Sequence, residues 1–425
     1  MKRNKTLLLV ILLLVAINLP AQTTRKEMFR DIYRTGSNYF AYPGPRQQKM
    51  TPAPSGYEPF FIFHYARHGS RYMSNNNYYV TAINMLDSAQ SVGLLTENGK
   101  QVLEKIRVGF ADAWHRDGDL TKLGGKQHRE IAQRMVERFP SLLKQPLKID
   151  AKSSTSRRCM LSMFNFCSEL QSFNPLLEIR MDASKHDMKY VVEDLTLKPK
   201  PTNLSNELWR QAGEIFEKAH DPRRLMAYLL TDTSQVAHSF NGRVLMEALY
   251  NIAEDLQNVP ELGISLIDIF TKDELFNMWK GYNASWLIDT GLVPGSAPFY
   301  HILDEVVDSL VSTSDRVIRE GFPTMTLRFS HDSSVLPLAY YLGLKEAVGA
   351  NDDLSSLHKH ISIDKIIPMA ANIQMVFYRK AGSGDVLVKF LLNENETTVP
   401  SLKSRTLPYY QWVDVKKLLN KNHSL

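Results

Sequence analysis

Short apolar runs, each bounded by polar residues, are the clearest pattern along the chain. Residues 60–66 are apolar or aromatic except for His64, with the length and composition of a strand buried on both faces. We interpret His64 as a hydrogen-bonded core residue. Residues 324–330 and 147–151 predict two further short strands. Near the end of the chain, two strand-like runs flank an Ala-Gly-Ser-Gly segment, which indicates a β-hairpin over 372–392.

Helix-period patterns fill most of the remaining chain. Residues 78–139 are helical in pattern, with Gly124-Gly125 as a break. Residues 22–59 are rich in Pro, Gly and Tyr and predict an irregular arm along the surface. From 186 to 290 there is almost no strand-like run, and helical patterns recur around 207–218, 222–230 and 243–256.

Strands and helices interrupted by a long helical block predict an α/β fold in two parts. We expect a mainly parallel sheet domain flanked by helices, formed by residues 22–185 and 291–425, with an inserted α-helical cap domain of residues 186–290. Ligands of open α/β sheets bind at the carboxyl ends of the strands. We therefore expect the cap to lie over that edge of the sheet.

Residues 1–21 predict a signal peptide. Three basic residues stand within the first five positions, and the apolar segment 7–17 is too short to span a bilayer comfortably. Ala21 offers a small residue for cleavage. A retained anchor is the alternative, although no cysteine follows the apolar segment to take a lipid. No later stretch is long and apolar enough to cross a membrane, so we expect a periplasmic or secreted protein without a stable membrane span.

The net charge bears on which partners to expect, and the cysteine content bears on disulfides. The net charge of the 425 residues is +6, and it falls to +3 without the three basic residues of the leader. That balance does not favour nucleic-acid binding, and no basic run with interleaved aromatic residues changes this interpretation. Cys159 and Cys167 are the only cysteines. On one helix they would lie about 12 Å apart, so we expect no disulfide.

The residues after the first predicted strand carry the strongest chemical signal. Arg67, His68, Gly69 and Arg71 stand at its end. Flanking arginines disfavour the imidazolium form of His68, which leaves a neutral, nucleophilic ring. They also offer donors suited to a phosphoryl group. Gly69 would let a substrate approach the backbone. The alternative is an exposed basic turn, but the buried strand and the second arginine favour a phosphoryl-transfer site.

Two further segments are expected to reach the same place. His331 and Asp332 directly follow the strand 324–330, and the carboxyl ends of two such strands can converge on one crevice. The strand 147–151 runs into serines that could cap a helix, whose apolar face we place on Leu161, Phe164 and Cys167. Arg158 would stand at the start of that helix, where free N–H groups also favour an anion.

Together these motifs resemble the histidine acid phosphatases, the family that contains phytases and multiple inositol-polyphosphate phosphatases. The resemblance spans about 60–378 and rests on the segments 67–72, Arg158 with Ser162, His331-Asp332, Leu120 to Gly124 with Gln127-His128, and the late strand 371–378. Arg-His-Gly-Ser-Arg-Tyr at 67–72 favours the inositol-polyphosphate branch. That branch usually carries His-Ala-Glu where this chain has His-Asp-Ser, the form of phytases and many acid phosphatases. Secreted eukaryotic members are rich in disulfides, so two cysteines favour a bacterial protein.

The resemblance implies a phosphomonoester hydrolase. A ring nitrogen of His68 would attack phosphorus and form a phosphohistidine. Asp332 would protonate the leaving group; its alternative role is a structural carboxylate that caps the following helix. The phosphoryl oxygens would be held by Arg67, Arg71, Arg158 and His331.

Inositol polyphosphates such as phytate are the expected substrates, and they require cations beyond the phosphoryl site. Lys185 and Lys189, at the start of the cap, are predicted substrate contacts, with a solvated face as the alternative. Further candidates are Arg210, Lys218, Arg223, Arg224 and Arg243. A periplasmic sugar-phosphate or general acid phosphatase is the alternative enzyme; a phosphomutase and an inactive phosphate-binding protein are the other classes. No histidines stand with carboxylates at metal-ligand spacing, so we expect no metal and no cofactor.

Overall fold

The computed structural model describes residues 21–198, 200, 202–233, 241–296, 300–320, 324–351 and 353–423. The predicted signal peptide, apart from Ala21, lies outside the described residues. Among the described residues, none of the helices combines the length and apolar character that crossing a bilayer requires.

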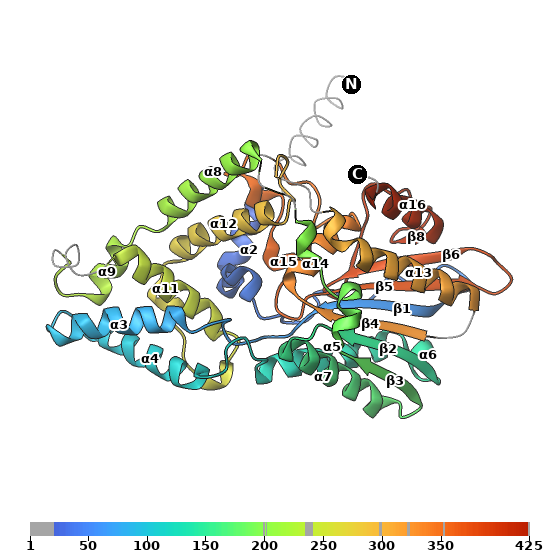
Figure 1. Ribbon diagram of the computed structural model, residues 1–425, viewed down its shortest axis with the longest axis horizontal. Helices are drawn as coiled ribbons and strands as arrows, with labels where there is room; N and C mark the ends of the chain where they lie inside the picture. The colour runs from blue at the N-terminus through green and yellow to red at the C-terminus, as the bar shows by residue number, and fades with distance from the viewer. Residues whose placement is uncertain are drawn as a thin grey trace, which may run out of the picture.

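An eight-stranded mixed sheet forms the centre of the molecule (Figure 1). Its parallel part, in spatial order, consists of β3 (Leu177–Asp182), β2 (Leu147–Ser153), β4 (Thr324–Ser330) and β1 (Tyr57–Arg67). The antiparallel part consists of β5 (Asn372–Lys380), β6 (Val386–Leu392), β7 (Asn395–Thr397) and β8 (Tyr409–Gln411). The three predicted strands and the predicted hairpin are confirmed.

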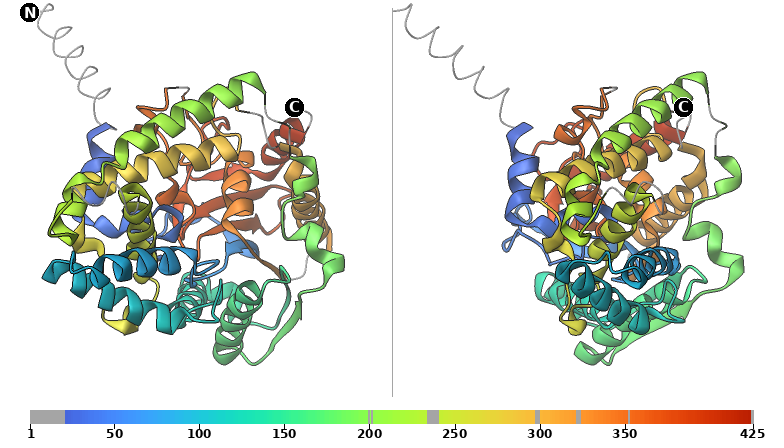
Figure 2. Two further views of the ribbon diagram at one scale, coloured as in Figure 1. Left: turned by 60° about the vertical axis from the view of Figure 1, so that its left-hand side comes forward. Right: turned by 90° about the vertical axis from the view of Figure 1, so that its left-hand side faces the viewer.

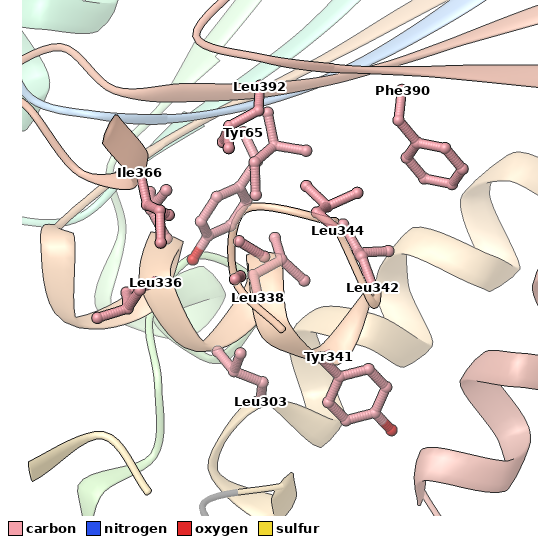
Figure 3. Close-up of a cluster of buried hydrophobic side chains, with 14 of the residues drawn as sticks. Tyr65, Leu303, Leu336, Leu338, Tyr341, Leu342, Leu344, Ile366, Phe390 and Leu392 are labelled. Atoms are coloured by element: carbon pink, nitrogen blue, oxygen red, sulfur yellow. The ribbon is translucent and has the colours of Figure 1, made fainter. Parts of the chain in front are cut away.

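Helices cover both faces of the sheet, as the α/β prediction requires. One face packs on α5 (Lys122–Arg138), α6 (Pro140–Leu143) and α7 (Arg157–Phe173). The other packs on α13 (Asp304–Glu320), α14 (Asp332–Tyr341) and α16 (Trp412–His423). Figure 3 shows how Tyr65 of β1 points from the sheet toward Leu336 and Leu338 of α14. Successive residues of β1 serve the two cores in turn, which explains why its sequence is almost continuously apolar.

A helical part lies beside the sheet. The helices α3 (Asn77–Ser91), α4 (Glu97–Ala113), α9 (Arg223–Leu229) and α11 (Gly242–Leu256) share a separate core. Two more, α8 (Asn203–Ala219) and α12 (Lys272–Asp289), run alongside one another (Figure 2). The helical patterns predicted within 186–290 are therefore confirmed. The domain boundaries stay a prediction, and the shared core shows that α3 and α4 pack with the predicted cap helices.

Three local predictions were wrong. Gly124-Gly125 does not break a helix but lies inside α5. A Cβ on Gly124 would come within 2.2 Å of the carbonyl oxygen of Ser70, so this glycine permits close packing. The segment 22–59 is not wholly irregular, because it begins with α2 (Ala21–Arg30) and a 3₁₀ helix, η1 (Ile32–Tyr39). In α7 the buried face carries Cys159, Ser162, Met163, Phe166, Cys167 and Leu170, whereas Leu161 and Phe164 are exposed.

Candidate active site

The predicted convergence of the two histidines is present. Strands β1 and β4 are parallel neighbours with Arg67 opposite Ser330, so His68 and His331 leave the same edge of the sheet side by side. Their ring centroids are 5.6 Å apart. Both line a cavity of about 440 Å³, which is enclosed from the other side by residues of η1, α11 and α12.

His68 is held as a neutral imidazole with one nitrogen free. Its Nδ1 lies 2.9 Å from the carbonyl oxygen of Gly69, a partner that can only accept, so Nδ1 carries the proton. Nε2 therefore keeps its lone pair. Burial, followed by the positive charges of Arg67 and Arg71, holds the pKa of His68 well below its usual value. A neutral ring at every physiological pH is what a nucleophile requires.

Arg67 lies behind the cavity rather than in its wall. The side chain is fully buried, and Nη1 donates to the carbonyl oxygens of Asn38 and Ile367, the latter at 2.8 Å. Its Nη2 lies 2.8 Å from Oδ2 of Asp332. Burial lowers the pKa of Arg67 to about 10 although Asp332 opposes the change, so the guanidinium remains charged. Arg67 thus positions Asp332; its predicted contact with a phosphoryl oxygen stays a prediction.

Asp332 is an ionised carboxylate in the free protein. Its Oδ2 also accepts from Nδ2 of Asn38 at 2.8 Å, and its Oδ1 accepts from the backbone N–H of Ser333 at 3.0 Å. Burial raises the pKa of Asp332, but Arg67 and Asn38 outweigh it and lower the pKa to about 2. The contact with Ser333 agrees with a role at the helix start. However, the carboxylate also lines the cavity beside His331, so it remains accessible for proton transfer.

Arg71 and Arg158 are the cations of the cavity wall. Nη1 of Arg71 donates to the carbonyl oxygen of Tyr72 at 2.7 Å, and the guanidinium lies 4.9 Å from the ring centroid of Tyr39. Burial opposes its charge, but Tyr39, Asp332 and Asp255 together raise the pKa of Arg71. Two arginines that converge beside a neutral histidine form a receptor for a phosphoryl group.

His331 is oriented through both ring nitrogens. Nδ1 lies 3.4 Å from Nη2 of Arg158, which can only donate, and Nε2 lies 3.0 Å from Oγ of Ser154. We therefore assign the proton of the neutral ring to Nε2, since Nδ1 must accept. Burial and Arg158 lower the pKa of His331 to about 4. Ser154, directly after β2, thus orients His331, whereas Ser156 makes no side-chain cap at the start of α7.

Gly69 has a packing role that the sequence did not indicate. A Cβ at this position would lie 2.4 Å from the carbonyl oxygen of Gly124 in α5. The glycine therefore lets α5 approach the motif, and the approach of a substrate to its backbone stays a prediction. The backbone N–H of Gly69 donates to Oγ of Ser162 at 3.1 Å. This bond anchors the loop that carries His68 to α7.

Sequence reasoning missed the residues that close the cavity. Asn38 and Tyr39 come from η1, within the segment predicted to be an irregular arm, and α11 and α12 contribute Tyr250, Asn251, Glu254, Tyr282 and Trp286. No local signal marks them, because only the packing of η1 against the two helices brings them together. The helical periodicity of α11 and α12 could have indicated at most which residues share a face.

Glu254 is a buried acid in this wall. Burial raises its pKa well above the usual value. The Thr35 hydroxyl lies 2.8 Å from Oε1 of Glu254 and 2.6 Å from the carbonyl oxygen of Ile32. In the contact with Glu254 the Thr35 hydroxyl is the donor, and this hydrogen bond opposes the effect of burial on the pKa of Glu254.

The predicted cap contacts do not reach the cavity. Lys185 and Lys189 belong to an exposed 3₁₀ helix, η2 (Lys185–Tyr190), and Nζ of Lys189 lies 3.4 Å from a carboxylate oxygen of Glu305. Neither lysine lines the cavity, nor does any other cap cation named above. Four of those cations pair with acids instead: Arg210 with Glu207, Arg223 with Asp221, Arg224 with Glu274 and Arg243 with Glu217.

Potential metal ligands do not gather within the described ranges, where no group of three or more His, Cys, Asp or Glu side chains is arranged to hold an ion. Cys159 and Cys167 are both buried free thiols. Sγ of Cys159 lies 3.1 Å from the carbonyl oxygen of Ser330, so this thiol helps to hold the start of the His331 loop.

Two buried histidines lie beneath the site. His64 and His128 are fully buried, and neither ring has a hydrogen-bond partner among the described residues, so the expected hydrogen bond of His64 is not present. The His64 ring packs on Phe166 and Phe329, and the His128 ring packs on Phe329. Burial lowers the pKa of each histidine to about 3. Both stay neutral when folded but gain protons when unfolded in mild acid.

We predict that acid destabilises the protein because of these lowered pKa values. Between pH 6.5 and 4 an unfolded histidine is protonated while the buried one is not, so each lowers the free energy of unfolding by up to about 1.4 kcal/mol per pH unit. Four buried histidines with lowered pKa values destabilise the fold as the pH falls: His64, His68, His128 and His331. Two buried acids with raised pKa values, Glu254 and Asp255, stabilise it over the same range. The net effect is a loss of stability as the pH falls.

Urea unfolding at several pH values measures this dependence. His64→Phe removes one titrating group and keeps a ring between Phe166 and Phe329. Its slope of stability against pH should be lower than that of the wild type by about 1.4 kcal/mol per pH unit. An unchanged slope would show that His64 is protonated in the folded state.

Comparisons with known proteins agree with the geometry. No family model matches the chain. The chain is 22% identical over 382 residues to multiple inositol polyphosphate phosphatase 1 of Homo sapiens, covering 81% of this chain and 76% of that one. The multiple inositol polyphosphate phosphatase of Bifidobacterium longum, solved in complex with inositol hexasulfate, superposes with a TM-score of 0.72 at 19% identity over 90% of this chain and 97% of that chain.

A second solved structure shares the fold. The phytase from D. castellii has a TM-score of 0.68 at 14% identity, covering 92% of this chain and 85% of that chain. The fold prediction is confirmed, and so is the resemblance to the histidine acid phosphatases, because these relatives and neighbours carry the names of that family's phytases and inositol-polyphosphate phosphatases.

Proposed function

We propose that the chain is a phosphomonoester hydrolase that acts on inositol phosphates through a phosphohistidine at His68. The observation that carries this proposal is the state of His68: a neutral ring, fixed through Nδ1, whose free Nε2 belongs to the same cavity as Arg71, Arg158 and Asp332. The names of the relatives support inositol phosphates as the substrate class.

In the proposed first step, the two arginines hold the phosphoryl oxygens while Nε2 of His68 attacks phosphorus in line. The P–O bond to the leaving group breaks as the P–N bond forms, and Asp332 supplies the proton that the leaving oxygen needs. Because Asp332 is ionised in the free protein, this step requires that the charge of the bound phosphate raises its pKa. Water then cleaves the P–N bond, with the Asp332 carboxylate accepting its proton.

Trapping the covalent intermediate tests this proposal. With an excess of substrate, rapid quenching should reveal one phosphoryl group per chain on His68, and inorganic phosphate should accumulate with repeated turnovers. A phosphomutase would instead return the phosphoryl group to an organic product, and a phosphate-binding protein would release none. Phosphate release without any phosphoenzyme would contradict the covalent mechanism.

We further propose that the protein is exported to the periplasm or the exterior of a bacterial cell. The basic and then apolar pattern of residues 1–21 supports this location. A sugar-phosphate phosphatase remains the second candidate function, and the aromatic wall of the cavity favours it, because such a wall accommodates a ring with few charges.

A further inference from the structure

The cavity wall opposite the phosphoryl site carries no cation within the described part of the chain. Every lysine and arginine from Arg25 onward is among the described residues, and of these only Arg71 and Arg158 line the cavity. The opposite wall is aromatic and amide-bearing, with Tyr250, Tyr282, Trp286 and Asn251. Its one acid, Glu254, is buried, and burial raises its pKa well above the usual value. Positive charge is therefore confined to the end where phosphorus reacts.

The aromatic wall is held in place by its own contacts. The rings of Tyr250 and Tyr282 stack with centroids 5.4 Å apart and planes 20° apart. The Tyr250 hydroxyl donates to the carbonyl oxygen of Thr35 at 2.6 Å, and Nδ2 of Asn251 donates to the Tyr282 hydroxyl at 2.9 Å. Trp286 follows Tyr282 by four residues in α12, so both lie on one side of that helix. The wall is preorganised.

Ser37 adds a polar group whose hydrogen-bonding capacity is unused. It lines the same cavity and is buried, and its Oγ has no hydrogen-bond partner among the described residues. Its backbone has φ 59° and ψ −120°, a region that residues other than glycine rarely adopt. The strained backbone thus holds Ser37 in the wall, while its Oγ is enclosed by protein atoms and is not exposed to the cavity.

We propose that this cavity selects phosphomonoesters whose leaving group is a hydroxylated ring with few phosphates, such as a lower inositol phosphate, in preference to phytate. The ring packs on the aromatic wall. Each further phosphate would lose water against tyrosine and tryptophan without a cation to replace it, which is unfavourable. This inference rests on the proposed function and concerns its specificity.

Substrate competition at two ionic strengths tests the proposal. The kcat/KM for myo-inositol monophosphate should exceed that for phytate by about tenfold or more, and it should depend only weakly on salt because two arginines provide the charge contacts. A tenfold preference for phytate would overturn the proposal. Absence of phosphate release from every substrate, p-nitrophenyl phosphate included, would instead contradict the proposed function itself.

Variants of the wall separate ring binding from phosphate binding. Trp286→Ala should raise KM for inositol monophosphate by about tenfold while the inhibition constant of inorganic phosphate stays unchanged. Trp209→Ala, at a half-exposed tryptophan of α8 outside the cavity, is the matched control and should change neither. Equal effects of the two substitutions, or a parallel weakening of phosphate inhibition by Trp286→Ala, would refute a ring-binding wall.

Asn251→Arg should shift the preference toward phytate by supplying the missing cation; no shift would show that charge at this wall does not decide specificity.

Discussion

His68→Ala is expected to abolish turnover, with a fall in kcat of about a thousandfold or more, because the side chain that forms the covalent intermediate is removed. The fold should persist. The loop at His68 is held through its backbone, by the bonds from the His68 N–H to Ser330 and from the Gly69 N–H to Ser162. Initial rates with p-nitrophenyl phosphate and with an inositol phosphate measure the loss.

Two controls belong to this experiment. Inorganic phosphate should still raise the Tm of the variant, since Arg71 and Arg158 remain in the cavity. His186→Ala, at an exposed histidine of η2 outside the cavity, should keep wild-type activity. If His68→Ala retained even a tenth of the wild-type kcat, covalent catalysis at His68 would be wrong.

The sequence predicted the phosphoryl end of the site because each of its parts follows a buried strand. Such strands leave short apolar runs, and the residues directly after them are placed by the sheet itself. Strand β1 lies between β4 and β5 at the centre of the sheet, so His68 and His331 meet as a consequence of strand order. The local pattern of the chain was therefore sufficient for these residues.

The opposite wall of the cavity could not be predicted in the same way. Asn38 and Asp332 are hydrogen-bonded although 294 positions separate them in sequence, and nothing near Asn38 indicates that partner. The prediction of which face of α7 is buried was wrong for a related reason. Cys159 and Ser162 turn toward the sheet edge, where they bond Ser330 and Gly69, and these polar contacts leave Leu161 and Phe164 outside.

The cap cations were predicted to bind substrate from their positive charge alone, without regard to the acidic residues nearby in sequence. Arg210 stands three residues after Glu207 and four before Glu214, and it pairs with both. This spacing is visible in the sequence and indicates a helix-surface ion pair. An arginine paired in this way is a poor candidate for substrate binding. The specificity proposed above depends instead on shape, aromatic surface and hydrogen bonds.

Asp332→Asn is expected to separate substrates by their leaving groups. An inositol alkoxide is strongly basic and needs a proton, whereas p-nitrophenolate leaves without one. The loss in kcat/KM should therefore reach about 100- to 10,000-fold for an inositol phosphate and be much smaller for the aryl ester. Asparagine keeps an oxygen that can accept from the Ser333 N–H, so the start of α14 should remain intact.

A matched variant distinguishes proton donation from a general change of charge. Asp255→Asn alters another buried acid that acts on Arg71 but does not line the cavity. The Asp255→Asn variant should change kcat/KM for the inositol phosphate and for the aryl ester by a similar factor, because the substitution affects only how the phosphoryl group is held. If Asp332→Asn also lowered both rates equally, Asp332 would be a positioning residue for Arg67 and the proton would have to come from elsewhere. A loss confined to the alkyl ester assigns the proton to Asp332.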